Sequence, residues 1–456
     1  ALRKGIMDYE RRQIYRGPEK FIDLPSNPQA TEDAIDDALS DNPDNGDVMS
    51  AIVLEASPRR VLAMRQNSEM LTITGEGLRP AQSGLSDKAG PNIKLRRGAL
   101  IRVTKTPKNT WEITQLPEVE GAFVAMDPRN GEVRALVGGF DFEKNKFNHV
   151  TQAWRQPGSS FKPFIYSAAL EKGFTPATVV NDAPLFFGTG VTGGQPWEPK
   201  NYDGKFEGPM SLRTALKKSK NLVSIRILQS IGPKFGQEWV THFGFVADKH
   251  PAYLTMALGA GSVTPMQMVT GYSVFANGGY RVNPSLVTKI TDQRGKVLLD
   301  STPPPLSESM RGIDARNAFI MDSLLQDVAR SGTAAKAQAQ LKRPDIFGKT
   351  GTTNDSIDTW FVGFQPTLAA AVWMGYDTPK KLGDRETGGG LSLPIWINFM
   401  EHALKGVPVT EYQPPEGVTN VNGEWYYSEY ARGAGIRSVG VSPDGAAGTD
   451  NPGAGD

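Results

Sequence analysis

The sequence reads Arg155-Gln-Pro-Gly-Ser-Ser-Phe-Lys-Pro163 at the start of a helical run that extends to Gly173. Side chains three residues apart in a helix share one face, so Ser159 and Lys162 are expected to face each other. Pro163 is tolerated only in the first turn of a helix, which places the helix start at Ser159. The stretch therefore predicts an S-x-x-K pair at a helix N-terminus, where developing negative charge is stabilised.

This pair suggests nucleophilic catalysis without a histidine. A serine hydroxyl is a poor nucleophile until a base takes its proton. The four histidines form no H-E-x-x-H motif, and the chain contains no G-x-S-x-G motif. Lys162 can act as the base only if burial and a second cation depress its pKa. S-x-x-K alone is weak evidence, because a chain of this length contains it about once or twice by chance.

Two further motifs follow in chain order, Ser219-Lys-Asn221 (S-x-N) and Lys349-Thr-Gly-Thr-Thr353 (K-T-G). S-x-N is also common by chance. Ser40-Asp-Asn42 fits it too, but we interpret these residues as part of the turn that ends a helix. The K-T-G-T-T stretch is expected in only about one such chain in a thousand. The three motifs in this order form the set found in penicillin-binding proteins and class A β-lactamases.

The K-T-G stretch predicts a strand edge, because β-branched threonines favour extended backbone and Gly351 lets a ligand backbone approach closely. An extended peptide can add to such an edge as a further strand. We expect Lys349 and the threonine hydroxyls to bind a terminal carboxylate, with Lys349 as the second cation beside Lys162. Ser219 offers a hydroxyl for proton relay, and Asn221 offers an amide for the substrate backbone.

Strands at both ends of the main segment enclose a run of helices, which predicts an α+β domain. The turn Asp127-Pro-Arg-Asn-Gly131 indicates a hairpin between strands at 122–126 and 132–137. The other elements expected there are helices around 211–231, 264–277 and 314–330 and strands at 358–364 and 368–376.

Residues 48–118 have a different character, with short strand-like runs separated by turns rich in Gly, Pro, Asn and Lys. This pattern predicts a small β-barrel-like (OB-type) domain. The other predicted segments are a linker region with a short acidic helix at 1–47, the main domain at 119–410, a C-terminal extension at 411–432 and a disordered tail at 433–456.

The composition excludes several classes of function. The 456 residues carry 50 Lys and Arg against 49 Asp and Glu, which gives no electrostatic case for nucleic acid binding. The lack of cysteine excludes disulfides, thiolate zinc sites and a cysteine nucleophile. The sequence has no run of 18 apolar residues, so no membrane-spanning helix is predicted. We also expect no metal and no cofactor.

Residues 119–410 resemble the transpeptidase domain of class A penicillin-binding proteins, beginning with the nucleophile stretch quoted above. Similar segments are Trp197-Glu-Pro-Lys-Asn-Tyr-Asp-Gly204, Ala257-Leu-Gly-Ala-Gly-Ser-Val-Thr-Pro265, Asp358-Thr-Trp-Phe-Val-Gly-Phe364 and Thr387-Gly-Gly-Gly-Leu391. Residues 48–118 resemble the β module of the 1a type in Gram-negative bacteria. The resemblance implies the serine transpeptidase fold, an antiparallel sheet with helices on both sides.

Enzymes of this family cross-link peptidoglycan. A serine attacks the D-Ala-D-Ala end of a stem peptide, releases D-Ala and passes the acyl group to an amine of a neighbouring stem, and β-lactams acylate the same serine. The resemblance makes Ser159 the nucleophile, Lys162 its base, Ser219 the proton relay and Asn221 a substrate ligand. It places Lys349, Thr350, Gly351, Thr352 and Thr353 on the side that binds the carboxylate. Backbone N–H groups of Ser159 and Thr352 suit a tetrahedral oxyanion.

Class A members also carry an N-terminal glycosyltransferase domain behind a membrane anchor. This sequence shows neither, so we expect no polymerisation of glycan strands by this chain, and residues 1–25 resemble the linker that leaves the missing domain. The resemblance implies a periplasmic location, with a full-length parent anchored in the bacterial inner membrane. By analogy, the module at 48–118 docks an outer-membrane lipoprotein activator, and the alternative is a scaffold that only positions the catalytic domain.

Three other functions share the motifs. A D,D-carboxypeptidase differs only in its acceptor, which is water instead of an amine, and the motifs do not separate the two. A β-lactamase needs a further base for deacylation, a Glu in class A enzymes, and no matching segment lies between 221 and 349. A non-enzymatic penicillin sensor is acylated without turnover and needs a transmembrane relay, which this sequence does not contain.

Overall fold

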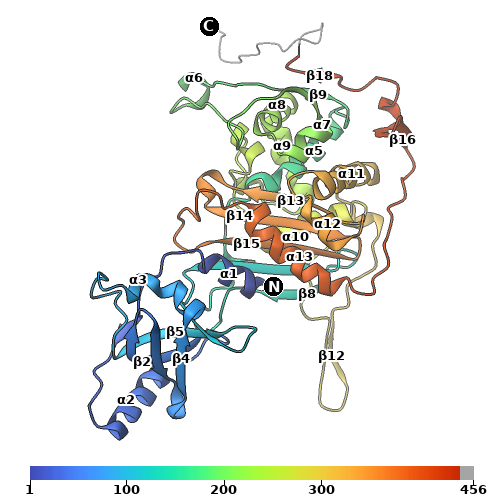
Figure 1. The fold of residues 1–456 in the computed structure, drawn as a ribbon. Helices are drawn as coiled ribbons and strands as arrows, with labels where there is room; N and C mark the ends of the chain where they lie inside the picture. Colours follow the sequence, from blue (N-terminus) through green and yellow to red (C-terminus); the bar gives the residue numbers. More distant parts are fainter. Residues whose placement is uncertain (442–456) are drawn as a thin grey trace. The chain divides into compact units, whose positions relative to one another are not determined.

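The computed structural model describes residues 1–441 of the chain (Figure 1). The chain divides into two compact units. The larger unit contains residues 121–139 and the chain from 147 onward, together with 1–2, and the smaller unit contains residues 3–120 and 140–146. Within the described residues, no helix combines the length and the hydropathy needed to cross a lipid bilayer.

A five-stranded sheet with the order β13-β14-β15-β7-β8 forms the centre of the larger unit (Figure 1). Its strands are β7 (Val119–Met126), β8 (Val133–Val137), β13 (Phe347–Thr352), β14 (Asp358–Gln365) and β15 (Leu368–Tyr376). Neighbours along β13-β14-β15 and the β7-β8 hairpin pair antiparallel. Every residue of β7 and β14 is buried, so both faces of the sheet are covered.

Helices and short strands complete the larger unit. The helices are α4 (His149–Gln152), α5 (Lys162–Glu171), α6 (Thr189–Thr192), α7 (Leu212–Lys218), α8 (Asn221–Ile231), α9 (Pro233–Val240), α10 (Pro265–Ala276), α11 (Ala315–Ser331), α12 (Lys336–Leu341) and α13 (Leu393–Ala403). The further strands are β9 (Val179–Asp182), β10 (Gly208–Ser211), β11 (Lys289–Thr291), β12 (Val297–Asp300), β16 (Val418–Val421), β17 (Glu424–Tyr427) and β18 (Ser438–Val439). Helices α10 and α13 both contact β14 and β15.

Helix α5, which follows the nucleophile stretch, lies in the core. Its residues are buried from Lys162 to Leu170, as expected for a helix that is apolar on nearly every side. The ring of Phe164 packs edge-on against Phe245 and Tyr272, with centroids 4.8 and 5.4 Å away. This aromatic packing fixes the position of the helix on which the predicted catalytic pair is mounted.

The helical run predicted over 211–231 is interrupted at the S-x-N motif. Ser219 has φ 56° and ψ 50°, a left-handed conformation that ends α7, and α8 begins at Asn221. A non-glycine residue in this region carries about 1–3 kcal/mol of strain, and such strain is concentrated at functional sites. At this interruption the Ser219 carbonyl and hydroxyl both face the amine of Lys162.

The smaller unit is built on a six-stranded antiparallel sheet, in which β1-β5-β2-β3-β4 are successive neighbours and β6 also pairs with β5. Its elements are α1 (Leu2–Glu10), β1 (Lys20–Phe21), α2 (Pro28–Asp41), β2 (Met49–Ser57), β3 (Arg60–Met64), β4 (Met70–Thr74), α3 (Gln82–Leu85), β5 (Ala99–Lys105) and β6 (Trp111–Thr114). Alternate residues such as Val61 and Ala63 in β3, and Leu71 and Ile73 in β4, fill its core. The short strands predicted between 48 and 118 form as β2 to β6.

Two segment boundaries differ from the predictions. Residues 1–25 were expected to form a linker, but they include α1 and β1, which pairs with β5, and Tyr15 belongs to the core of the smaller unit. The tail predicted from 433 begins too early, because β18 pairs with β9 in the larger unit. Short paired segments of this kind depend on distant partners, which local sequence composition does not reveal. Residues 442–456 of that tail lie outside the described residues.

Candidate active site

The nucleophile turn is a short 3-10 helix, Gly158–Phe161, that leads directly into α5. Two long-range hydrogen bonds hold it: the Tyr272 hydroxyl donates to the Ser160 carbonyl at 2.5 Å, and Trp360 Nε1 donates to the Gln156 carbonyl at 2.8 Å. Ser159 is partly exposed, and its hydroxyl makes no hydrogen bond among the described residues. The turn therefore presents this hydroxyl from a rigid support.

Strand β13, which carries the K-T-G motif, packs directly against this turn. A Cβ added to Gly351 would lie 2.6 Å from the Pro157 carbonyl oxygen and 2.9 Å from Ser160 Oγ. A Cβ added to Gly158 would lie 2.8 Å from the carbonyl oxygen of Thr352. Glycine was expected at 351 so that a ligand backbone can approach, but the backbone that approaches here is the protein's own. The two motifs thus meet through glycines that no larger residue can replace without a shift.

Lys162 is fully buried, and its amine is surrounded by hydrogen-bond acceptors. Lys162 Nζ lies 2.9 Å from the Ser219 carbonyl oxygen, 3.1 Å from Ser219 Oγ and 2.7 Å from Asn221 Oδ1. The left-handed backbone of Ser219 allows its carbonyl and hydroxyl to face the same amine. The structure therefore brings the first two motifs together around Lys162.

Lys349 completes the cluster from β13. Its Nζ donates to Ser219 Oγ at 2.9 Å and to the Thr350 carbonyl at 3.0 Å, so Ser219 Oγ lies between the two lysines. A neutral Lys162 amine has two N–H donors, which match the Ser219 carbonyl and Asn221 Oδ1, and one lone pair. That lone pair can accept the hydroxyl proton of Ser219 while Lys349 donates to the same oxygen. The geometry thus accommodates an uncharged Lys162.

Both lysines have lowered pKa values. Burial lowers the pKa of Lys162 well below its usual range, Lys349 and Lys220 add repulsion, and Asp182 partly opposes the shift. Burial also lowers the pKa of Lys349 to about 7. The lowered pKa favours the uncharged form of Lys162, which is the form needed for its predicted role as base. The pKa of Lys349, predicted as the second cation, is thus near neutrality.

Asn221 occupies the first position of α8 and holds the base in place. Its Oδ1 accepts from Lys162, its Nδ2 donates to the Lys200 carbonyl at 2.8 Å, and its backbone N–H donates to Asn201 Oδ1 at 2.9 Å. One N–H of the Asn221 amide remains for a ligand. Its predicted contact with the substrate stays a prediction.

The threonines of the K-T-G stretch lie in three different settings. The hydroxyls of Thr350 and Thr333 are 2.8 Å apart, and Thr352 Oγ1 accepts from the backbone N–H of Gly388 at 3.0 Å. Thr353 Oγ1 accepts from the Asp358 backbone N–H at 2.9 Å, which stabilises the turn into β14. Thr333 was missed at the sequence level, because it lies in no recognised motif and reaches β13 only through folding.

A buried ion pair behind the S-x-N motif was also missed. Lys220 Nζ lies 3.2 Å from Asp182 Oδ2 and 2.5 Å from Glu207 Oε2. Asn201, in the segment 197–204, donates to Asp182 Oδ1 at 2.7 Å. The sequence motifs include Asn201 and Lys220 without assigning either a role, and Asp182 and Glu207 lie in no recognised motif.

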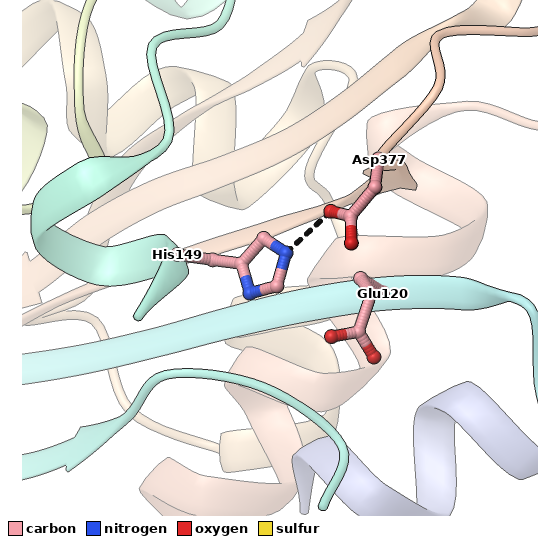
Figure 2. Close-up of side chains that lie close together, drawn as sticks. All are labelled: Glu120, His149 and Asp377. Carbon is pink, nitrogen blue, oxygen red and sulfur yellow. Dashed lines mark hydrogen bonds and ion pairs between the residues drawn. The ribbon is translucent and has the colours of Figure 1, made fainter. Parts of the chain in front are cut away.

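His149 is engaged elsewhere. Its Nε2 lies 2.6 Å from Asp377 Oδ1 (Figure 2), and its Nδ1 lies 2.6 Å from the Gly138 carbonyl oxygen. These two contacts hold His149 within the fold, and no sequence motif assigned it a catalytic role. Lys162, Ser219 and Lys349 form a hydrogen-bonded cluster without a histidine, whereas the predicted Ser159–Lys162 pair makes no hydrogen bond among the described residues.

Comparisons with known proteins agree with this architecture. A model of the penicillin binding protein transpeptidase domain matches residues 121–401, and a model of the penicillin-binding protein OB-like domain matches residues 15–119. Penicillin-binding protein 1A of Neisseria flavescens is 44% identical over 94% of this chain and 54% of its own length. The Pseudomonas aeruginosa protein of the same name is 39% identical over 92% of this chain and 57% of its own length.

Solved structures give the same result. Penicillin-binding protein 1A from Haemophilus influenzae matches with a TM-score of 0.84 and 30% identity, over 94% of this chain and 69% of that chain. PonA1 from Mycobacterium tuberculosis in complex with penicillin V matches with a TM-score of 0.57 and 29% identity, over 68% of this chain and 83% of that chain. These matches confirm the predicted α+β fold with an OB-like domain. The chain spans about half the length of the curated relatives it matches, and it belongs to the penicillin-binding protein transpeptidase family.

Proposed function

We propose that this chain is a peptidoglycan D,D-transpeptidase that works through a Ser159 acyl-enzyme and is acylated by β-lactams. The observation that carries the proposal is the position of Ser219 Oγ, 3.1 Å from Lys162 Nζ and 2.9 Å from Lys349 Nζ. This arrangement links all three motifs through one buried proton-transfer network. It supplies a base, a relay and a cation, and the base stands three residues after the partly exposed Ser159.

In the proposed reaction, Ser159 Oγ attacks the carbonyl carbon of the penultimate D-Ala as Lys162 takes the hydroxyl proton. The N–H groups of Ser159 and Thr352 stabilise the oxyanion. The tetrahedral intermediate collapses, the C–N bond breaks, and the leaving D-Ala amine receives a proton through Ser219. An amine of a second stem peptide then attacks the acyl-enzyme carbonyl and forms a new C–N bond, the C–O bond to Ser159 breaks, and the proton lost by the amine returns to Ser159 Oγ through Ser219 and Lys162.

The donor peptide is proposed to extend along β13. In the described part of the chain β13 pairs only with β14, so its other edge is available for β-augmentation. Lys349 and the hydroxyls of Thr350 and Thr352 then receive the terminal carboxylate, because charge-assisted hydrogen bonds to carboxylates are strong. Gly351 lets the strand pack against the nucleophile turn at Pro157 and Ser160.

The proposed setting follows that of the relatives: the periplasm, with the full-length parent held at the inner membrane. Docking of an outer-membrane lipoprotein activator on the OB-like domain remains part of this proposal. A D,D-carboxypeptidase would use water instead of an amine as the acceptor, so one experiment tests both functions. No observation on the site favours the β-lactamase or the sensor.

The test uses the chain with a labelled penicillin, and separately with a donor stem peptide that ends in D-Ala-D-Ala, with and without an amine acceptor. Formation of a stable adduct and of a cross-linked product supports the proposal. Release of D-Ala without cross-linking identifies a carboxypeptidase, and rapid hydrolysis of the drug adduct identifies a β-lactamase. Absence of any adduct on Ser159 refutes the family of reactions altogether.

A further inference from the structure

A charged pair is buried directly behind the S-x-N motif. The side chains of Lys220 and Asp182 are 6% and 0% exposed, and Lys220 Nζ lies 3.2 Å from Asp182 Oδ2. Asp182 also accepts from Asn201 Nδ2 at 2.7 Å and from the Glu207 backbone N–H at 2.8 Å. A buried ion pair is tolerated only when such hydrogen bonds satisfy it. This pair is therefore a specific feature rather than a solvated surface contact.

The pair is connected to the catalytic base on both sides. Lys220 stands between Ser219 and Asn221, the two residues whose oxygens hold the Lys162 amine. Asn201, which donates to Asp182, also accepts from the Asn221 backbone N–H at 2.9 Å. The carboxylate of Asp182 is thus close enough to influence the charge of Lys162, and it favours the charged form.

We propose that Lys220 is a positioning residue that neutralises the buried Asp182 carboxylate and thereby keeps the Lys162 amine uncharged for its role as base. Lys220 acts through Asp182 and does not touch the substrate. Without it, Asp182 becomes an unpaired buried anion near Lys162, and the ammonium form of Lys162 is stabilised. An ammonium ion has no lone pair and cannot accept the Ser159 proton. The inference rests on the proposed function and deepens it.

Among the charged groups that act on Lys162, Lys220 is the one that forms an ion pair with Asp182. Lys349 on β13 disfavours the charge on Lys162, Asp182 at the end of β9 favours it, and Lys220 disfavours it. Tyr166, one turn later on α5, stays protonated because burial raises its pKa. Glu207 is bonded to Lys220, whose hydrogen bond is the main reason that the pKa of Glu207 falls to about 2.

The experiment measures the rate of acylation by a fluorescent penicillin as a function of pH. In Lys220→Gln the acidic limb of the profile is expected to move to higher pH by about one unit, which is roughly a tenfold lower rate below its midpoint. Lys220→Arg should restore the wild-type midpoint, since the guanidinium can pair with Asp182. Asp182→Asn should move the midpoint in the opposite direction, to lower pH.

Lys218→Gln is the matched control. Lys218 lies two residues before Lys220 and contacts the same Glu207 at 2.9 Å, but its side chain is 46% exposed and it has no ion pair with Asp182. Its pH profile should equal that of the wild type. The double variant Asp182→Asn/Lys220→Gln removes both buried charges, so its midpoint should return toward the wild-type value even if Lys220→Gln alone folds poorly.

Two results overturn the inference. A rate in Lys220→Gln that falls by the same factor at every pH means that Lys220 only supports the fold. An unchanged midpoint in both Lys220→Gln and the double variant means that Asp182 does not act on Lys162. In either case the wild-type chain still forms its Ser159 adduct, whereas loss of the proposed function itself would appear as no adduct in the wild type.

Discussion

Lys349 Nζ lies 2.9 Å from Ser219 Oγ, although the two residues are 130 positions apart in the chain. The contact joins a strand lysine to the junction between α7 and α8. Lys162 reaches the same serine from α5, so three elements converge on one hydroxyl. Because all three groups are fixed by the core, a proton can pass between them without rearrangement of the backbone.

Replacement of Ser159 by alanine should abolish the covalent penicillin adduct, because the other hydroxyl beside the base, that of Ser219, is already hydrogen-bonded to Lys162 and Lys349. Intact-mass spectrometry after incubation with penicillin measures this directly. The matched control is Ser160→Ala, since the neighbouring Ser160 is buried and its hydroxyl donates to the Pro157 carbonyl at 2.6 Å. Ser160→Ala should keep the adduct, and an adduct on Ser159→Ala would remove the assignment.

Replacement of Lys162 by alanine should reduce the acylation rate by roughly 10²- to 10⁴-fold, the usual contribution of a general base. Stopped-flow measurement with a chromogenic β-lactam tests this expectation. Lys172→Ala removes an exposed lysine at the C-terminal end of the same helix and should leave the rate unchanged. A Lys162→Ala rate close to that of the wild type would mean that another group takes the proton.

Replacement of Gly351 by alanine should lower both stability and acylation. The new Cβ would lie 2.6 Å from the Pro157 carbonyl oxygen, so β13 must move away from the nucleophile turn. Overpacking of this kind destabilises by about 1–3 kcal/mol, measured here by urea denaturation. Gly188→Ala is the control, because its Cβ meets nothing within 4 Å. Equal stability of the two variants would contradict the close approach of β13 to Pro157.

Replacement of His250 by phenylalanine should remove part of the acid sensitivity of the fold. His250 is buried and stacks on Phe161 with ring centroids 4.6 Å apart, and burial lowers its pKa from 6.5 to about 4. Neither ring nitrogen has a hydrogen-bond partner among the described residues. Between pH 6.5 and 4 the His250 imidazole is therefore protonated in the unfolded chain but neutral in the folded chain. The free energy of unfolding is thus highest above pH 6.5 and decreases as the pH falls toward 4.

The loss amounts to about 3 kcal/mol at most for this one residue. Urea unfolding of the wild type and of His250→Phe at several pH values between 4 and 6.5 measures it. His402→Phe, which changes an exposed histidine in the last turn of α13, should retain the wild-type pH dependence. A wild-type slope in His250→Phe would show that the charge is accommodated without cost.

Much of the fold was predictable because local patterns encode it. Short strand-like runs between turns rich in Gly, Pro, Asn and Lys marked the strands of the OB-like domain, and the Asn-Gly pair marked the turn between β7 and β8. Pro163 predicted a helix start at Ser159; a 3-10 helix covers Gly158–Phe161, and α5 itself begins at Lys162. The break at Ser219 was not predicted, because a left-handed serine carries no local signal and is stabilised only by its distant partners.

The sequence by itself determined which chemistry-bearing side chains exist and on which elements they stand, since spacing and local propensity act within a few residues. Only the tertiary structure decided that Ser219 lies between Lys162 and Lys349 and that Lys220 pairs with Asp182. The low pKa values of Lys162 and Lys349 also follow from the tertiary structure. Burial and charge repulsion arise only when segments far apart in the chain are packed together and water is excluded.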